Sequence, residues 1–399
     1  MPEYKSPGVY VEEVPSAIRP IAGVGTSTAG FIGLVPDNVG MPESPGEPYK
    51  VAPENEPQLI TNWAEFTKKF GKIQDSNKYL ARAVYGFFEN GGTRCWVIRI
   101  TSFKSTTAND AVREALVKFE AIDEIALIAI PMPSDIGAGN KNLSRRVEIR
   151  EMMLSHCENL KDRFAILDGE EVVQNDLVPK NIYSNSDKTA MGKTSNYGAV
   201  YFPWIDISGN QEYLPPCGHI AGIYSRVDSE RGVHKAPANE FIRGALGLKY
   251  RLSKSQQDGL NPDGINVIRQ FNGSPTIWGA RTIGGDANAD FKYISVRRLF
   301  NFIRESIDEG TRWVVFEPND ISLWQKIKRN VSAFLTNVWR DGALFGATPE
   351  EAFYVKCDEE TNPFEVRELG QVIIEIGIAI VKPAEFVIFR ISQWAGPSA

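Results

Sequence analysis

A short β-prone segment near the start of the chain, residues 9–14 within SPGVYVEEVP, constrains the fold most. A Pro-Gly pair precedes it and Pro15 follows it, and the next residues are again rich in proline and glycine. A strand this short has no stability of its own, and such a linker does not fold back as a tight hairpin. The segment must therefore find a sheet elsewhere. The side chains involved are Val9, Tyr10, Val11 and Val14.

The other end of the chain carries a similar pattern. Residues 370–383 and 385–393 are both β-prone and flank a proline, and the second segment is apolar on nearly both faces. A strand of this kind must be covered on both faces. Two interpretations remain open: the ends pair within their own chain, or they are donated to the sheet edge of another subunit. The residues concerned are Phe386, Val387, Ile388, Phe389 and Ile391.

Between the ends, strand-like and helix-like patterns alternate, which predicts an α/β fold with a partly parallel sheet. A chain of 399 residues exceeds one ordinary core, so we expect two lobes, with mixed sheets flanked by helices. The two arms can share a sheet only if the two termini lie close together. The N-terminal arm is therefore expected beside the domain that leads into the C-terminal arm, which we call the inner domain. The expected divisions are an arm at 1–20, an outer domain at 21–254, an inner domain at 255–383 and a final strand at 384–399.

Local patterns also predict individual elements. Apolar runs bounded by turn residues predict strands over 26–36, 94–100, 125–131, 164–169 and 198–207. Periodic segments predict helices over 63–71, 79–92, 109–120, 144–160, 218–228 and 294–311. The segment RWVVFEPND, residues 312–320, is predicted to be a strand followed by a turn.

Composition excludes several classes. The net charge of −6 and pI of about 5.4 argue against nucleic acid as the main partner. The densest apolar run, residues 372–381, is short and contains Glu375, so no membrane insertion is expected. The start of the chain lacks the apolar region of a signal peptide. Four widely spaced cysteines predict free thiols in a reducing compartment.

Searches for catalytic patterns find none that fits, so catalytic, cofactor-binding and metal-binding residues are all predicted to be absent. AMGKTS at 190–195 lacks the upstream glycine of a phosphate-binding loop. The histidines, His156, His219 and His234, have no metal-ligand spacing, although His234 lies in an unusual loop. A Rossmann-like α/β enzyme is the alternative for residues 94–207, but RITSFKST supplies no glycine-rich turn.

The helix predicted over 322–340 has two distinct faces. One is an apolar stripe, and the opposite stripe carries cations without any acid, in a chain that is acidic overall. This second stripe is either a solvated face or a surface that docks on an acidic partner. The cations are Lys326, Arg329 and Arg340.

Several long blocks together resemble the tail sheath proteins of contractile phage tails and related injection systems. They are SPGVYVEEVPSAIRPIAGVGTSTAGFIG at the start, AGIYSRVDSERGVHKAPAN, then LNPDGINVIRQF with TIWGARTI, and the run from ISVRRLFNFIRESIDEGTRWVVFEPND to LWQKIKRNVSAFLTNVWRDGALFGATPEEAFYVKCDEETNP. The blocks follow the order of the family and cover nearly the whole chain, without the large inserted domains of some phage sheaths.

The resemblance implies a mechanism. Sheath subunits stack as hexameric rings around an inner tube, exchange terminal arms, and contract to drive the tube through a target envelope. It implies self-association, an inner tube partner, and baseplate and tail-terminator proteins. It implies assembly in the cytoplasm of the producing cell, and neither enzymatic activity nor a cofactor. An alternative is a baseplate or scaffold component of the same machine.

Overall fold

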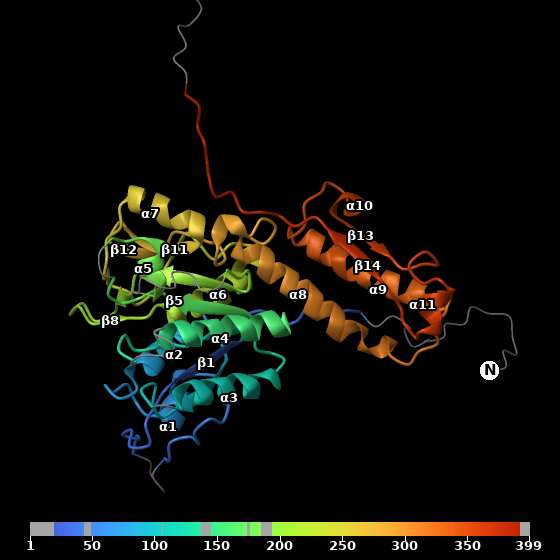
Figure 1. The fold of residues 1–399 in the computed structure, drawn as a ribbon. Helices are drawn as coiled ribbons and strands as arrows, with labels where there is room; N and C mark the ends of the chain where they lie inside the picture. Colours follow the sequence, from blue (N-terminus) through green and yellow to red (C-terminus); the bar gives the residue numbers. More distant parts are fainter. Residues whose placement is uncertain are drawn as a thin grey trace, which may run out of the picture. The chain divides into compact units, whose positions relative to one another are not determined.

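The computed structural model describes residues 20–43, 49–105, 107–136, 145–173, 176–184 and 194–391 (Figure 1). Within these ranges the chain divides into two compact units. The larger unit comprises residues 24–305 and 380–391, and the smaller unit comprises residues 20–23 and 306–379. Helix α8 (Ile294–Thr311) supplies residues to both.

This boundary, between Glu305 and Ser306, differs from the one expected near residue 254. Strand β11 (Ile265–Phe271) pairs in parallel with β6 (Gly198–Phe202), so the segment after 254 completes the sheet of the larger unit. The C-terminal residues 380–391 also belong to the larger unit, not to the smaller one. The described residues next to the two predicted arms therefore belong to different units.

A nine-stranded sheet forms the centre of the larger unit, in the order β2-β3-β1-β4-β5-β6-β11-β12-β9. Its six central strands pair in parallel, and antiparallel strands finish both edges. The remaining bounds are β1 (Ala29–Leu34), β2 (Gln58–Ile60), β3 (Cys95–Ile100), β4 (Leu127–Ala129), β5 (Phe164–Asp168), β9 (Glu240–Phe241) and β12 (Ser274–Ile277). A small sheet contains β7 (Ile205–Asp206), β8 (Tyr213–Leu214) and β10 (Gly247–Leu248).

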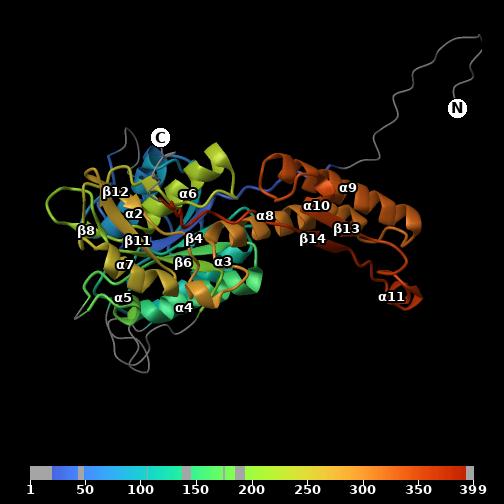
Figure 2. The same ribbon diagram turned by 90° about the horizontal axis from the view of Figure 1, so that it is seen from above.

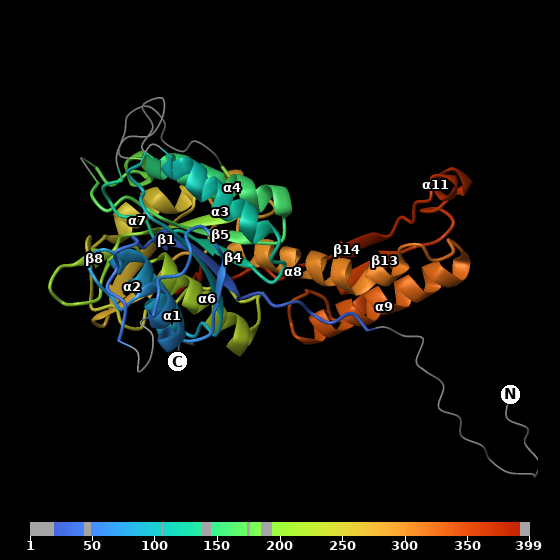
Figure 3. The same ribbon diagram turned by 90° about the horizontal axis from the view of Figure 1, so that it is seen from below.

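Helices cover both faces of the large sheet, with α3 and α4 on one side and α2 and α6 on the other (Figure 3). Alternate strand residues supply the two cores. Phe31 packs with Phe87 of α2, while its neighbour Ile32 belongs to the core that contains Phe119 of α3. The bounds are α1 (Trp63–Phe70), α2 (Lys78–Glu89), α3 (Ala108–Glu120), α4 (Arg145–Leu160), α5 (Pro179–Ser184), α6 (Cys217–Arg231) and α7 (Lys254–Leu260).

A buried ion pair ties three distant segments of the larger unit together. The Arg298 guanidinium on α8 donates to Asp228 Oδ1 at 2.9 Å and to Asp228 Oδ2 at 2.5 Å, at the end of α6. Arg298 also donates to the Thr26 carbonyl at 2.9 Å, and the Thr26 hydroxyl donates to Asp228 at 2.6 Å. The start of the first strand is thereby held to two helices.

The smaller unit is built around α9 (Ile321–Arg340), which contacts β13 (Phe353–Lys356), and β13 pairs antiparallel with β14 (Glu375–Ile378) (Figure 2). Its shorter elements are a 3₁₀ turn (Arg312–Val314), α10 (Pro349–Ala352) and α11 (Phe364–Glu368). In the described part of the chain, β13 and β14 pair only with each other, so both outer strand edges of this sheet are unpaired.

Most elements predicted from the sequence are confirmed, among them α8 with the predicted bounds. Several strand predictions differ from the structure or find no partner in it. Residues 312–320 form a 3₁₀ turn and a loop. The strand expected over 370–383 is limited to β14, and residues 385–391 have no strand partner within the described residues. The strand at 198–207 splits into β6 and β7 around Pro203, which has no amide hydrogen to donate.

Candidate functional site

The C-terminal segment is the most exposed apolar stretch of the described chain. Its side chains are 69% exposed at Phe386, 70% at Val387, 78% at Ile388, 84% at Phe389 and 95% at Ile391. Soluble monomers seldom display contiguous apolar surface of this kind without a partner. The segment therefore has the composition of a buried strand but has no sheet partner within the described residues.

Glu385 anchors this segment immediately before the exposed stretch. Its carboxylate accepts two hydrogen bonds of 2.8 Å from the Arg281 guanidinium, one on each oxygen. Asn261 donates to it at 2.8 Å and the Tyr293 hydroxyl donates at 2.9 Å. Partial burial raises the pKa of Glu385, but the hydrogen bonds from Arg281, Asn261 and Tyr293 outweigh it and hold that pKa below its ordinary value.

The N-terminal residues Val9, Tyr10, Val11 and Val14 lie outside the described residues. The chain is described from residue 20, and Ile21 is buried in the smaller unit. It packs against α8 at Gly310, where an added Cβ would lie 2.7 Å from the Ile21 side chain. A glycine at this position thus makes room for the residue that follows the predicted arm.

Helix α9 confirms the predicted apolar stripe. Asp320 caps its start by accepting from the Leu323 amide at 2.8 Å. The opposite stripe exposes Arg329 and Arg340, with Lys326 half-buried. Within the described residues, no carboxylate pairs with these three cations. The buried stripe consists of Trp324, Ile327, Val331, Phe334, Leu335 and Val338.

The surroundings make this cationic stripe more distinctive. Residues 306–379 contain thirteen aspartates and glutamates against seven lysines and arginines. Four of those seven cations lie on α9. The smaller unit therefore presents one basic helix face on a body that is otherwise acidic.

The residues tested for chemistry do not converge on a reaction centre. His156 and His219 are buried on α4 and α6, and burial lowers the pKa of each to about 4. All four cysteines are buried and free. Part of the segment 190–195 lies outside the described residues, and Ser195 bridges to Ile283. Over the described ranges there is no cluster of metal-binding side chains, and no helix has the length and apolarity to cross a bilayer.

The anchor formed by Arg281 and Glu385 was not foreseen from the sequence. The two residues are separated by 104 positions, and no local pattern marks either of them. Arg281 is 3% exposed, and a buried arginine requires an acidic partner, but the sequence does not say which of the 50 acidic residues provides it. Only the folded arrangement identifies the pair.

Comparisons with known families match two consecutive parts of the chain. Residues 126–283 match the phage tail sheath protein central domain, and residues 286–393 match the phage tail sheath C-terminal domain. The matched segments follow each other without overlap and include most of the larger unit's second half, α9 and the exposed C-terminal segment.

Curated relatives align over part of their length. The tail sheath protein of Vibrio phage KVP40 is 30% identical over 198 residues, which is 49% of this chain and 28% of that protein. The tail sheath protein of Burkholderia phage BcepMu is 28% identical over 189 residues, which is 45% of this chain and 38% of that protein. The aligned part is thus less than half of either relative.

Solved structures align over nearly the full chain. A chain of the contracted helical sheath of the anti-feeding prophage is 29% identical with a TM-score of 0.77, covering 98% of this chain and 99% of that one. The contracted sheath complex of the extracellular contractile injection system PVC gives 26% identity and a TM-score of 0.74, covering 99% of both chains. A chain of the anti-feeding prophage baseplate gives 28% identity and a TM-score of 0.76, covering 98% and 99%.

Proposed function

We propose that this chain, which belongs to the phage tail sheath family, polymerises as stacked hexameric rings around an inner tube and contracts to drive that tube through a target envelope. The observation that carries the proposal is the segment 386–391, whose large apolar side chains are exposed without a partner in the described chain. Such a segment is suited to strand addition to another copy.

The smaller unit offers the matching acceptor. The β13–β14 pair has unpaired outer edges within the described residues, and a two-stranded sheet gains stability when further strands are added. In our proposal, residues 9–14 and 386–391 of neighbouring copies complete this sheet. A ladder of backbone hydrogen bonds holds the register, while the Pro- and Gly-rich linker bends as the bodies rearrange.

Truncation tests the arms directly. Deleting residues 1–15 is expected to leave a folded monomer by circular dichroism that forms no tubes by negative-stain microscopy. The double variant Phe389→Asp and Ile391→Asp should behave in the same way, because two charges on one face of the strand prevent its burial. Lys382→Asp, which precedes the Glu385 anchor, is the matched control and should still polymerise. Normal tubes from the truncated chain would refute arm exchange.

The basic face of α9 is the proposed contact with an acidic inner tube. Single exposed ion pairs contribute about 0–1 kcal/mol, so the cylinder must repeat the contact many times to fix its register on the tube. Reversing Lys326, Arg329 and Arg340 to glutamate should impair assembly on the tube at low salt and leave the subunit folded. Lys328→Glu, on a different face of α9, is the control. If the triple variant assembles on the tube as the wild type does, we would conclude that this stripe is a solvated face and does not contact the tube.

A second candidate is a baseplate subunit, because a chain of the anti-feeding prophage baseplate aligns over 98% of this chain. Long tubes from the purified protein favour the sheath, whereas rings that do not elongate favour the baseplate. In either role we expect baseplate and tail-terminator proteins as partners, assembly in the cytoplasm of the producing cell, and no catalytic step, cofactor, nucleic acid or membrane insertion.

A further inference from the structure

Phe316 is presented to solvent by an unusual backbone. It lies in the loop between the 3₁₀ turn and α9, where its φ is +68°. Bulky residues rarely adopt this left-handed conformation, because Cβ crowds the following carbonyl. The side chain is 102% exposed, so no packing within its own chain compensates for the strain. Strain of this kind persists where it positions a residue for a function.

Other exposed apolar side chains occur on the same loop, at the start of α9 and on α11. The Asn319 amide donates to the Gln371 carbonyl at 2.9 Å, and Arg367 lies over the Trp324 ring at 6.0 Å. These contacts bring the loop and α11 together. We define the acidic-rimmed patch as their exposed apolar residues with the carboxylates beside them: Val315, Phe316, Ile321, Phe364 and Leu369, with Glu317, Glu365 and Glu368.

The larger unit carries a surface of opposite character on the β11–β12 hairpin. Phe271 and Trp278 contact each other at 4.6 Å between ring centroids, and the Arg269 guanidinium lies 5.2 Å from the Phe271 ring. Arg269 also lies in register with Thr276 and Phe241 across three strands, on one face of the sheet. Arginine and aromatic residues are the types most enriched where proteins bind each other.

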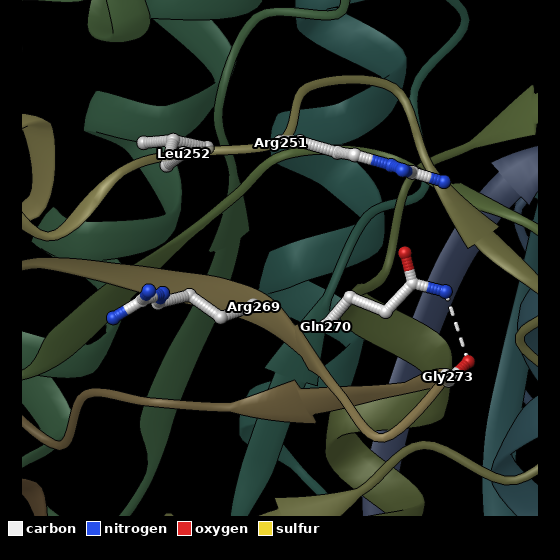
Figure 4. A pocket seen from close by; sticks show the side chains of 5 residues that line it. All are labelled: Arg251, Leu252, Arg269, Gln270 and Gly273. Carbon is white, nitrogen blue, oxygen red and sulfur yellow. Dashed lines mark hydrogen bonds between the residues drawn. The ribbon is translucent and has the colours of Figure 1, made fainter.

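A cavity of about 420 Å³ adjoins this hairpin, lined by Arg251, Leu252, Arg269, Gln270 and Gly273. Figure 4 shows the guanidinium groups of Arg251 and Arg269 pointing in opposite directions on two sides of it, with the Gln270 amide bonded to the Gly273 carbonyl at 2.9 Å. No carboxylate in the described chain pairs with Arg251 or Arg269. The two cations therefore flank a hollow with an aliphatic wall.

We propose that the acidic-rimmed patch of one copy docks on the aromatic–arginine surface of a second copy, defined by Phe241, Arg251, Arg269, Phe271 and Trp278. The two surfaces are complementary in charge, and both have large apolar centres. Phe316 enters the cavity, where its ring makes a cation–π contact with the Arg251 guanidinium. Glu317, the next residue, pairs with Arg269.

This contact is heterologous, since it joins two different surfaces. Contacts of this class propagate into rings or helical filaments instead of closing as dimers. The inference rests on the proposed self-assembly and adds to it a contact between bodies, separate from the exchange of arms. It also accounts for the strained backbone at Phe316, because this conformation holds the aromatic ring out from the loop, where it reaches a cavity on another copy.

A charge exchange tests the pairing. Glu317→Arg and Arg269→Glu should each raise the critical concentration for polymerisation about tenfold or more, measured by sedimentation of the full chain. The double variant, which restores the pair with reversed signs, should recover most of that loss. Glu350→Arg, an exposed change on α10, is the matched control and should polymerise like the wild type.

A second variant excludes misfolding as the cause. Phe316→Gly relieves the strained backbone, so it should be at least as stable in urea as the wild type, yet assemble as poorly as Glu317→Arg. Polymerisation unaffected by either charge reversal, or a double variant no better than the single ones, would overturn the contact and leave the proposed function standing. A wild-type chain that stays monomeric at every concentration would overturn both.

Discussion

The two units differ in how completely they bury their own apolar surface. Among the described residues, eight large apolar side chains are exposed in the 74 residues of Ser306–Ala379, and twelve are exposed in the far longer larger unit, five of them in its C-terminal segment 386–391. Both hydrophobic clusters lie in the larger unit, which also contains the buried pair of Arg298 and Asp228. Apart from its C-terminal segment, the larger unit buries its own apolar surface, whereas the smaller unit has surfaces that other chains can complete.

The strongest test of this contrast is a core deletion. Phe31→Ala removes a ring with no exposed area, and it should destabilise the larger unit by about 3–5 kcal/mol. Leu369→Ala in the smaller unit, where the side chain is 73% exposed, should change stability by less than about 0.5 kcal/mol. Urea unfolding followed by tryptophan fluorescence measures both. Equal losses would mean that the smaller unit is packed as well as the larger one.

Ion pairs should show the next largest difference. Asp228→Asn leaves the buried Arg298 charge without its carboxylate and should cost about 3 kcal/mol. Asp308→Asn removes one ion pair of Arg312 on the surface of the smaller unit and should cost less than about 1 kcal/mol. Thermal unfolding of the two variants at equal protein concentration compares them. A similar cost for both would show that Arg298 is hydrated after the change.

Acidification from pH 6.5 to 5 should lower the free energy of unfolding of the larger unit by about 2 kcal/mol and leave that of the smaller unit nearly unchanged. Burial lowers the pKa of His156 and His219 to about 4, so the unfolded chain binds more protons below pH 6.5 and their stabilising effect is lost as the pH falls. Burial raises the pKa of Asp168 to about 6, which acts in the opposite direction and offsets part of the loss. From pH 6.5 to 5 the larger unit should therefore lose about 2 kcal/mol.

The smaller unit contains none of the three histidines, so its stability should stay nearly constant over the same pH range. Hydrogen exchange resolved by peptide measures each unit separately. His219→Phe should reduce the pH dependence of the larger unit alone. Parallel losses in both units would contradict the assignment of this effect to the buried histidines.

The smallest expected difference concerns matched helix caps. Asn62 caps α1 of the larger unit by accepting from the Glu65 amide at 2.9 Å, and Asp320 caps α9 of the smaller unit. Replacing either with alanine should cost about 1 kcal/mol. Because α9 supplies most of the buried apolar side chains described in its unit, Asp320→Ala should speed amide exchange along the whole helix, and Asn62→Ala only near the start of α1. Equally local effects would mean that the smaller unit is as cooperative as the larger one.

Local patterns predicted what depends on local chemistry. Helix α8 and the buried stripe of α9 follow directly from periodicity, and β1 and β3 follow from apolar runs. The segment 312–320 was misassigned because its β-branched and aromatic residues favour a strand by composition, while the fold exposes Val315 and Phe316 in a loop. The domain boundary and the Arg281–Glu385 anchor depend on pairings between distant residues, which a single sequence does not reveal.

The anchors of the two arms define a load path. The chain next to the N-terminal arm is fixed in the smaller unit by Ile21 at Gly310, and the chain before the C-terminal arm is fixed in the larger unit by Glu385 at Arg281. A pull between the arms must therefore cross from one unit to the other. The chain crosses at three places, after residues 23, 305 and 379, and only the second crossing lies inside a regular helix, α8. Under such a pull, helix α8 should be the stiffest of the three connections, and the non-helical crossings after residues 23 and 379 should stretch first.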